Sequence, residues 1–328
     1  MHIPDNYLSP ETCAVMTAAM VPVWTYAVKK VKKEVPKEKM PMLGVGSAFS
    51  FTGMMFNVPM PGGTTGHAVG GTLIAMLLGP EAACIAVTIA LLIQALLFGD
   101  GGILAFGANC FNMAFILPFA GYGIYRLVMR LLGGKDGATG AKEIAAVAIG
   151  AYVGINAAAL AAAVEFGIQP LLFTDAAGTP LYCPYDLSIS IPAMMIGHLT
   201  VFGLAEVIFT TAIYAFVRKT SPGDLYGGGF AEASPGINRT PIYILLLVLV
   251  LAVPAGLIAT GTAWGEWDIA QIPTMTEGFS WSALWPDYSM AGLPEFAGYI
   301  LSAVIGAASL TLVFRIISSF MKTTVNYD

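Results

Sequence analysis

Nine apolar runs occupy most of this sequence, and they restrict the fold more than any other feature. They cover Thr12–Val28, Met42–Val58, Ala68–Leu78, Ala82–Phe98, Met113–Leu132, Ile144–Val164, Ile189–Val217, Ile242–Thr260 and Phe296–Ser318. Most are long enough to cross the ~30 Å hydrocarbon core of a bilayer as helices. Only 11% of the residues are charged, against roughly 25% in soluble domains. The sequence therefore predicts an all-α, polytopic integral protein of the plasma (inner) membrane.

The positive charges predict the orientation of the chain in the membrane. If all nine runs cross and the N-terminus lies outside, every one of the 15 Lys and Arg residues falls on the cytoplasmic side, as the positive-inside rule requires. The outer connections then carry acidic residues and no basic ones, among them Asp5, Asp100 and Glu165. A negatively charged outer surface would concentrate divalent cations. The alternative is that acidic residues are free to lie outside and have no such role.

Composition divides the chain into three parts. Residues 1–220 form the expected main membrane domain, and residues 221–240 form a hydrophilic cytoplasmic linker. Residues 241–328 are expected to form a two-helix extension with an external acidic, Trp-rich loop at 261–294.

The first two residues, Met1 and His2, offer an unusual set of nitrogen donors. We expect the start methionine to be retained because His2 is bulky. The α-amine of Met1, the amide nitrogen of His2 and its imidazole could then close two small chelate rings around one metal ion. If the amide ionises, these donors lie in a plane, and planar nitrogen coordination suits Ni(II) or Cu(II) better than zinc, magnesium or calcium.

His67 is the natural fourth ligand. It lies in the segment PMPGGTTGHAVGG between two apolar runs, on the same predicted outer side as His2. Glycine lets backbone approach a neighbour closely, so the N-terminal arm is expected to fold into a pocket under residues 59–67 and 99–108. The alternative is that an N-terminal Met-His pair is accidental and His67 is a hydrogen-bonded structural residue.

Other polar residues near the outer ends of the runs are candidates for supporting this site. A ligating histidine usually needs a partner that orients its ring. The candidates are Asn57, Thr65, Asp100, Asn109 and Asn112, each of which could instead cap a helix or fix a turn. His198 and Glu206 lie inside the seventh run and could pair. A structural contact that fixes this helix is the favoured interpretation for both.

Three motifs in order resemble the CbiM/NikM family, the substrate-binding S components of energy-coupling factor (ECF) transporters for cobalt and nickel. They are MHIPDNYLSP, MMFNVPMPGGTTGHAVGGTL and GDGGILAFGANCFNMA. The resemblance covers roughly residues 1–220. Residues of about 240–320, with the stretch PDYSMAGLPEFAGYI, are similar to the CbiN/NikN-like extension that some members carry fused. Asn6 stands where members commonly have Gly, and Asn tolerates the left-handed turn expected there.

This resemblance implies a seven-helix S-component core with about two further helices. It implies that Met1, His2 and His67 bind Ni²⁺ or Co²⁺ as substrate, with nickel favoured over cobalt. It also implies a transmembrane coupling subunit and two ATP-binding cassette ATPases as partners. The small-residue pair Ala14 and Ala18 is the candidate contact with the coupling subunit. Membrane lipid is expected around the chain, and nucleic acid is not expected among its partners.

The sequence does not favour an enzyme. No G-x-x-x-x-G-K-[ST] motif is present, so ATP hydrolysis would need another chain. No serine or cysteine nucleophile has plausible triad partners. The four scattered cysteines predict neither a disulfide framework nor a thiolate metal site. A stand-alone, ion-coupled secondary transporter is the alternative class, but no inverted repeat supports it.

Overall fold

The computed structural model describes residues 1–60, 65–133, 139–226, 239–259 and 278–320, and it is almost entirely helical. Its helices are α1 (Pro10–Glu34), α2 (Met40–Met55), α3 (Gly71–Leu78), α4 (Pro80–Ile93), α5 (Phe106–Asn109), α6 (Leu117–Gly133), α7 (Ala141–Gly167), α8 (Gln169–Leu172), α9 (Leu187–Gly197), α10 (Gly203–Thr220), α11 (Thr240–Ala252) and α12 (Glu295–Phe320). The predicted all-α fold is confirmed.

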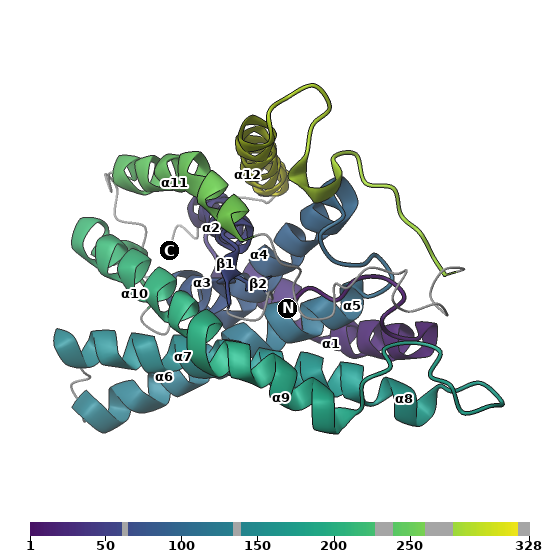
Figure 1. The fold of residues 1–328 in the computed structure, drawn as a ribbon. Coiled ribbons are helices and arrows are strands. Elements are labelled where there is room, and N and C mark those ends of the chain that lie inside the picture. Colours follow the sequence, from purple (N-terminus) through teal and green to yellow (C-terminus); the bar gives the residue numbers. More distant parts are fainter. Residues whose placement is uncertain (61–64, 134–138, 227–238, 260–277, 321–328) are drawn as a thin grey trace.

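Short π-helical turns join several of these helices into longer rods. Gln94–Phe98 continues α4, Cys110–Ile116 joins α5 to α6, and His198–Phe202 joins α9 to α10. Strands β1 (Val58–Pro59) and β2 (Thr65–Gly66) form an antiparallel pair in which Val58 faces Gly66 and Pro59 faces Thr65. Figure 1 shows α6 and α7 along one side of the bundle, α11 and α12 on the opposite side, and α2, α3 and α4 between them.

Six helical segments of the described chain are long and apolar enough to cross a bilayer: Pro80–Phe98, Phe106–Gly133, Ala141–Leu172, Leu187–Thr220, Thr240–Ile258 and Glu295–Phe320. The first three of the nine predicted spans fall outside this group. Helix α1 ends in a lysine-rich stretch, α2 has 16 residues, and α3 has only eight. The protein is a multi-pass membrane protein.

Helix α3, which corresponds to the third apolar run, is too short to cross the membrane. At 1.5 Å per residue, α3 is about 12 Å long, less than half of the hydrocarbon thickness. It ends at Leu78, and the next helix, α4, begins beside Lys30, whose amine lies 2.8 Å from Glu81. Lys30 lies twenty residues after Pro10 along α1, roughly 30 Å from the N-terminal end of that helix. The irregular segment that precedes α3 must therefore descend into the helix bundle.

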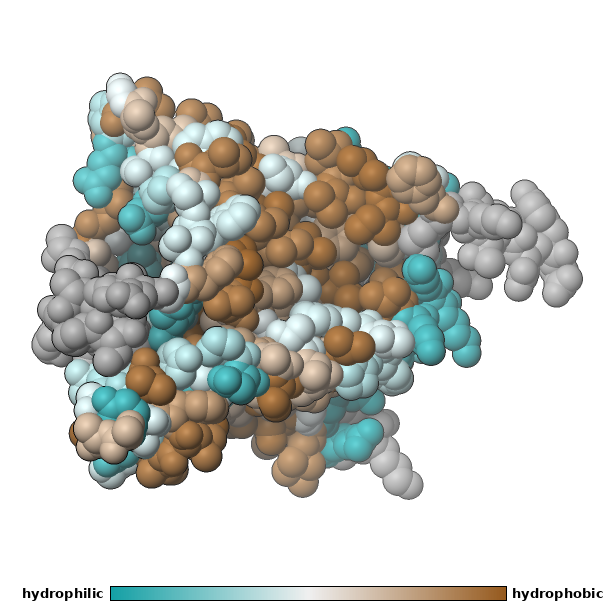
Figure 2. Space-filling model, turned by 90° about the vertical axis from the view of Figure 1, so that its right-hand side faces the viewer, coloured by the Kyte–Doolittle hydropathy of each residue, from teal (hydrophilic) through white to brown (hydrophobic). Residues whose placement is uncertain are grey.

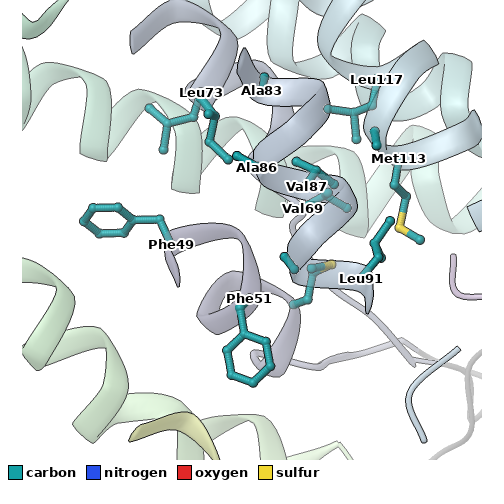
Figure 3. Packing of buried hydrophobic residues seen from close by; sticks show 14 of the residues in the cluster. Phe49, Phe51, Val69, Leu73, Ala83, Ala86, Val87, Leu91, Met113 and Leu117 are labelled. Atoms are coloured by element: carbon teal, nitrogen blue, oxygen red, sulfur yellow. The ribbon is translucent and has the colours of Figure 1, made fainter. Parts of the chain in front are cut away.

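The core lies where α2, α3 and α4 meet the rod formed by Cys110–Ile116 and α6 (Figure 3). Phe49 and Phe51 come from α2, Leu73 from α3, and Val87 from α4, and all four are fully or almost fully buried. Much of the face in Figure 2 is hydrophobic. Exposed side chains such as Leu131, Ile208 and Leu251 lie on helices that can span the membrane, which fits surfaces that face lipid.

One predicted loop residue is helical instead. Glu165 was expected in an outer connection that begins at residue 165, but α7 continues to Gly167 and buries it. Its carboxylate accepts a hydrogen bond from the Asn112 amide at 2.8 Å, which explains how this carboxyl group is accommodated inside the bundle. Residues 227–238 of the predicted linker and 261–277 of the predicted external loop lie outside the described residues.

Candidate metal centre

The N-terminal arm enters the protein as an irregular segment held by its backbone. The Ile3 amide donates to Asn109 Oδ1 at 2.7 Å, and Asn109 Nδ2 donates back to the Ile3 carbonyl at 3.0 Å. The Gly102 amide also donates to that carbonyl at 2.8 Å. Met1, His2 and Ile3 are all buried, so the first residues of the chain are enclosed by the fold.

Asp5 anchors the arm to the loop before α5. Its carboxylate accepts the backbone N–H groups of Ile103 at 3.0 Å and Leu104 at 2.7 Å. A Cβ at Gly102 would lie 2.3 Å from Asp5 Oδ1, so only glycine permits this approach. The next residue, Asn6, has φ of +69°, the left-handed turn predicted for this position.

His67 is presented by the segment between β2 and α3, and a buried carboxylate holds that segment. Glu206 on α10 accepts the N–H of Val69 at 2.7 Å and of Gly70 at 3.0 Å. Gly70 has φ of +70° and directly precedes α3. Because the segment is clamped from one side and its backbone turns sharply, the imidazole of His67 is fixed in a site where it is only 7% exposed.

The rings of His2 and His67 meet inside this enclosure. Their centroids are 5.0 Å apart with an interplanar angle of 34°. His2 Nδ1 lies 2.7 Å from Asp100 Oδ1, which assigns the proton to Nδ1 and the lone pair to Nε2. His2 Nε2 is buried and has no hydrogen-bond partner within the described chain. His67 Nδ1 faces the Ala68 carbonyl at 3.2 Å, which likewise leaves the lone pair on Nε2.

Electrostatics keep His67 in its metal-binding form. Burial, together with the positive charge of the N-terminal amine, lowers the pKa of His67 well below its ordinary value of 6.5. Burial alone would raise the pKa of Asp100, but hydrogen bonds from His2 and Tyr288 lower it below its usual range. A neutral imidazole and an ionised carboxylate are the states that a carboxylate–histidine–metal arrangement needs.

Side chains alone do not supply three ligands here. Across the residues that the structure describes, no group of three His, Cys, Asp or Glu side chains could hold a metal ion. Main-chain nitrogen of Met1 or His2, both buried at this end of the chain, could add donors to the two imidazoles. The donor set is nitrogen-rich, the kind that favours nickel, copper or cobalt over magnesium or calcium.

The other predicted site residues separate into two groups. Asp100 and Asn109 contact His2 and Ile3 directly. Asn112 instead binds Glu165, Thr65 lies buried in β2 opposite Pro59, and Asn57 follows the end of α2. Ala14 and Ala18 lie on an exposed face of α1.

His198 and Glu206 do not pair. His198 Nδ1 lies 2.9 Å from the Met194 carbonyl one turn back on its own helix, while Glu206 supports the His67 segment. Sequence reasoning gave Glu206 no role at the site, although a carboxylate inside an apolar run was a signal. Asp5 and Tyr288 were also missed, and neither has a local sequence pattern that marks it.

The fold and this enclosure define a class: a polytopic helical membrane protein with a closed, nitrogen-rich binding site, as expected of a membrane transport protein rather than an enzyme. Residues 2–223 match the family described as the CbiM cobalt uptake substrate-specific transmembrane region, and the chain belongs to this family. Residues 238–323 match the PDGLE domain.

Two relatives match the sequence of this chain over nearly its whole length. A probable fused nickel transport protein, LarMN, of Lactiplantibacillus plantarum is 50% identical, over 96% of this chain and 97% of the relative. The fused nickel transport protein NikMN of Rhodobacter capsulatus is 45% identical, over 94% of each chain. The crystal structure of a truncated transition metal transporter is 61% identical with a TM-score of 0.62, over 67% of this chain and 99% of that one.

Proposed function

We propose that this protein captures Ni²⁺ from outside the cell and delivers it across the membrane, as the substrate-binding subunit of an ATP-driven ECF uptake transporter. The observation that carries the proposal is the convergence of His2, His67 and the buried N-terminus in one enclosure. The proposed ligands are Met1, His2 and His67. Transport of Co²⁺ is the alternative substrate assignment, supported by cobalt transport proteins among the more distant relatives.

The structure offers two ways for His2 to bind the ion. The predicted planar chelate needs Nδ1, because only Nδ1 can close a six-membered ring with the metal and the amide nitrogen of His2. In the structure Nδ1 faces Asp100, so chelation requires a half turn of the ring about its Cβ–Cγ bond. Binding through Nε2 requires no turn of the ring, and the amide nitrogen of His2 is then not a ligand.

The partners follow from what the chain lacks. Its sequence carries no Walker-type phosphate loop, so ATP hydrolysis requires separate ATPase subunits and a transmembrane coupling subunit. The exposed alanines of α1 are the proposed contact with that coupling subunit. A stand-alone secondary transporter would instead accumulate metal in liposomes that contain this chain alone, without ATP.

The test uses a matched pair of histidine variants in the full-length protein. His67→Ala removes a proposed ligand, and His198→Ala removes a buried histidine whose Nδ1 faces its own helix. Nickel affinity, measured by titration calorimetry in detergent, should be lost in His67→Ala and kept in His198→Ala. Equal nickel affinities in His67→Ala and the unchanged protein would refute the site.

A further inference from the structure

Tyr288 brings a hydroxyl group from the C-terminal region to the edge of the metal centre. Its hydroxyl donates a hydrogen bond to Asp100 Oδ2, while Asp100 Oδ1 contacts His2. Gln94 Nε2 lies 3.1 Å from the same Oδ2 and 2.9 Å from the Tyr288 hydroxyl. A continuous polar chain thus runs from the C-terminal region through one carboxylate to the imidazole of His2.

The backbone around Tyr288 takes an unfavourable shape to reach this position. Asp287 and Tyr288 have φ values of +52° and +58°, two consecutive left-handed residues that are not glycine. Left-handed backbone is unfavourable for residues other than glycine. Such backbone persists where the surroundings determine it, and it concentrates at functional sites.

The surroundings of Tyr288 do determine its position. Its ring stacks on Phe98 with centroids 4.8 Å apart, and Tyr299 meets it edge-on at 5.4 Å. Ser302 Oγ on α12 donates to the Tyr288 carbonyl at 2.9 Å. Nearby, the Trp285 amide donates to the Leu97 carbonyl at 2.8 Å. The hydroxyl is therefore presented by a rigid aromatic cluster that joins α12 to the π-helical turn Gln94–Phe98.

We propose that Tyr288 is a positioning residue for metal binding, which holds the Asp100 carboxylate that orients His2. The C-terminal region then completes the metal centre of the N-terminal region rather than serving only as an attached module. This inference rests on the proposed function, because it takes His2 as a ligand, and on binding through Nε2, which keeps Nδ1 on Asp100. Outer groups that orient ligating histidines typically change metal affinity by 10- to 100-fold when lost. Tyr288 acts one step further out and should contribute about tenfold or less.

The first experiment compares two tyrosine-to-phenylalanine changes in the full-length protein. Tyr288→Phe keeps the stacked ring and removes only the hydroxyl on Asp100. Tyr299→Phe is the matched control, because Tyr299 lies in the same cluster but its hydroxyl donates to the Met55 carbonyl. Nickel affinity should fall up to about tenfold in Tyr288→Phe and stay unchanged in Tyr299→Phe, with the absorption band of bound Ni²⁺ shifted only in Tyr288→Phe.

A double-mutant cycle tests whether the effect passes through Asp100. If it does, Tyr288→Phe should cause no further loss of nickel affinity in an Asp100→Ala background, because the carboxylate that it holds is gone. If the Asp100→Ala protein does not fold, Asp100→Asn is used in its place. Unchanged affinity and absorption in Tyr288→Phe would overturn the inference, as would an equal loss with and without Asp100. Normal nickel binding by His67→Ala would instead refute the proposed function itself.

Discussion

At the scale of single residues, the contact between His2 Nδ1 and Asp100 governs what the centre can do. It assigns the proton to Nδ1 and leaves the buried Nε2 without a hydrogen-bond partner among the described residues, on a ring whose centroid lies 5.0 Å from that of His67. Two imidazoles are too few for tight binding of a transition metal ion. In the proposed site, the amine of Met1 supplies a further nitrogen, the donor that an ordinary two-histidine site would lack.

One added residue tests the amine as a ligand. A glycine placed before Met1 converts the amine to an amide, moves the new terminus by one residue and must fit where Met1 is only 5% exposed. High-affinity nickel binding should be lost. The control is a glycine added after Asp328, which leaves the amine intact and should leave binding unchanged. Equal affinities in the two extended proteins would exclude the amine as a ligand.

Acid should destabilise the metal-free protein through His67. Its pKa is lowered in the folded state, mainly by burial and then by the positive charge of the N-terminal amine. Below about pH 6.5 the unfolded chain therefore takes up a proton that the folded chain does not, and the free energy of unfolding falls as pH decreases. The slope for one group approaches about 1.4 kcal/mol per pH unit.

The measurement is the melting temperature of the metal-free protein in detergent at about pH 7.5 and about pH 5.5, on either side of the ordinary histidine pKa. His67→Gln removes the titrating ring, so its melting temperature should fall less between these two values. An equal fall in both proteins would show that His67 does not contribute to the pH dependence.

The meeting of His2 and His67 was predictable because histidine is rare in this sequence. Only three histidines exist, and two of them converge in the structure. The role of Asp100 could not be decided in advance, since an aspartate between glycines also suits a turn. Asp5 was still less visible, because its partners are backbone N–H groups nearly 100 residues away, which no local pattern records.

At the scale of elements, the connection between β2 and α3 depends on α10. The sequence predicted an apolar run over Ala68–Leu78, but the helix begins only at Gly71. Residues 67–70 remain irregular because Glu206 binds the N–H groups of Val69 and Gly70 and replaces helical hydrogen bonds there. An apolar pattern cannot reveal this, since it records burial and not the partner of each backbone group.

Glu206→Gln should loosen this connection without removing a proposed ligand. The glutamine side chain has one acceptor oxygen where glutamate has two. Its NH₂ group would therefore face a backbone N–H, which would lose its acceptor, and the protein would be destabilised by about 1–3 kcal/mol. Nickel affinity should fall because His67 is no longer fixed. Glu143→Gln is the control: Glu143 is also buried, but it binds Tyr214 and Arg218 instead. Equal nickel affinities in the two variants would argue against the clamp.

At the scale of the whole molecule, the candidate metal centre and the lysines at the end of α1 and before α2 lie at opposite ends of the bundle. At the basic end, Lys30 binds Glu81, Lys39 Nζ donates to the Gly223 carbonyl, and Ser318 donates to the Lys37 carbonyl. At the other end, the Cys183 amide donates to the Tyr7 carbonyl, which places the loop before α9 beside the arm. This separation supports the proposed orientation, with the centre outside.

The packing of the C-terminal region was beyond sequence reasoning. Apolar composition indicated helices at both of its ends, but helix–helix packing in lipid depends on shape more than on hydrophobicity. Gly44 on α2 illustrates this, since a Cβ there would lie 3.0 Å from the Thr311 backbone of α12. Nothing local in the sequence marks which glycine faces which helix.

Cysteine labelling in intact cells tests the orientation of the whole chain. The four native cysteines are buried and should give little background. Lys33 is exposed and lies 23 residues after Pro10 along α1, roughly 35 Å away. Ala177 is exposed in the loop beside the arm. A membrane-impermeant maleimide should therefore label Ala177→Cys in intact cells and label Lys33→Cys only after the cells are opened. Labelling of Lys33→Cys alone in intact cells would reverse the topology, placing His2 and His67 on the cytoplasmic side, where capture from outside could not begin.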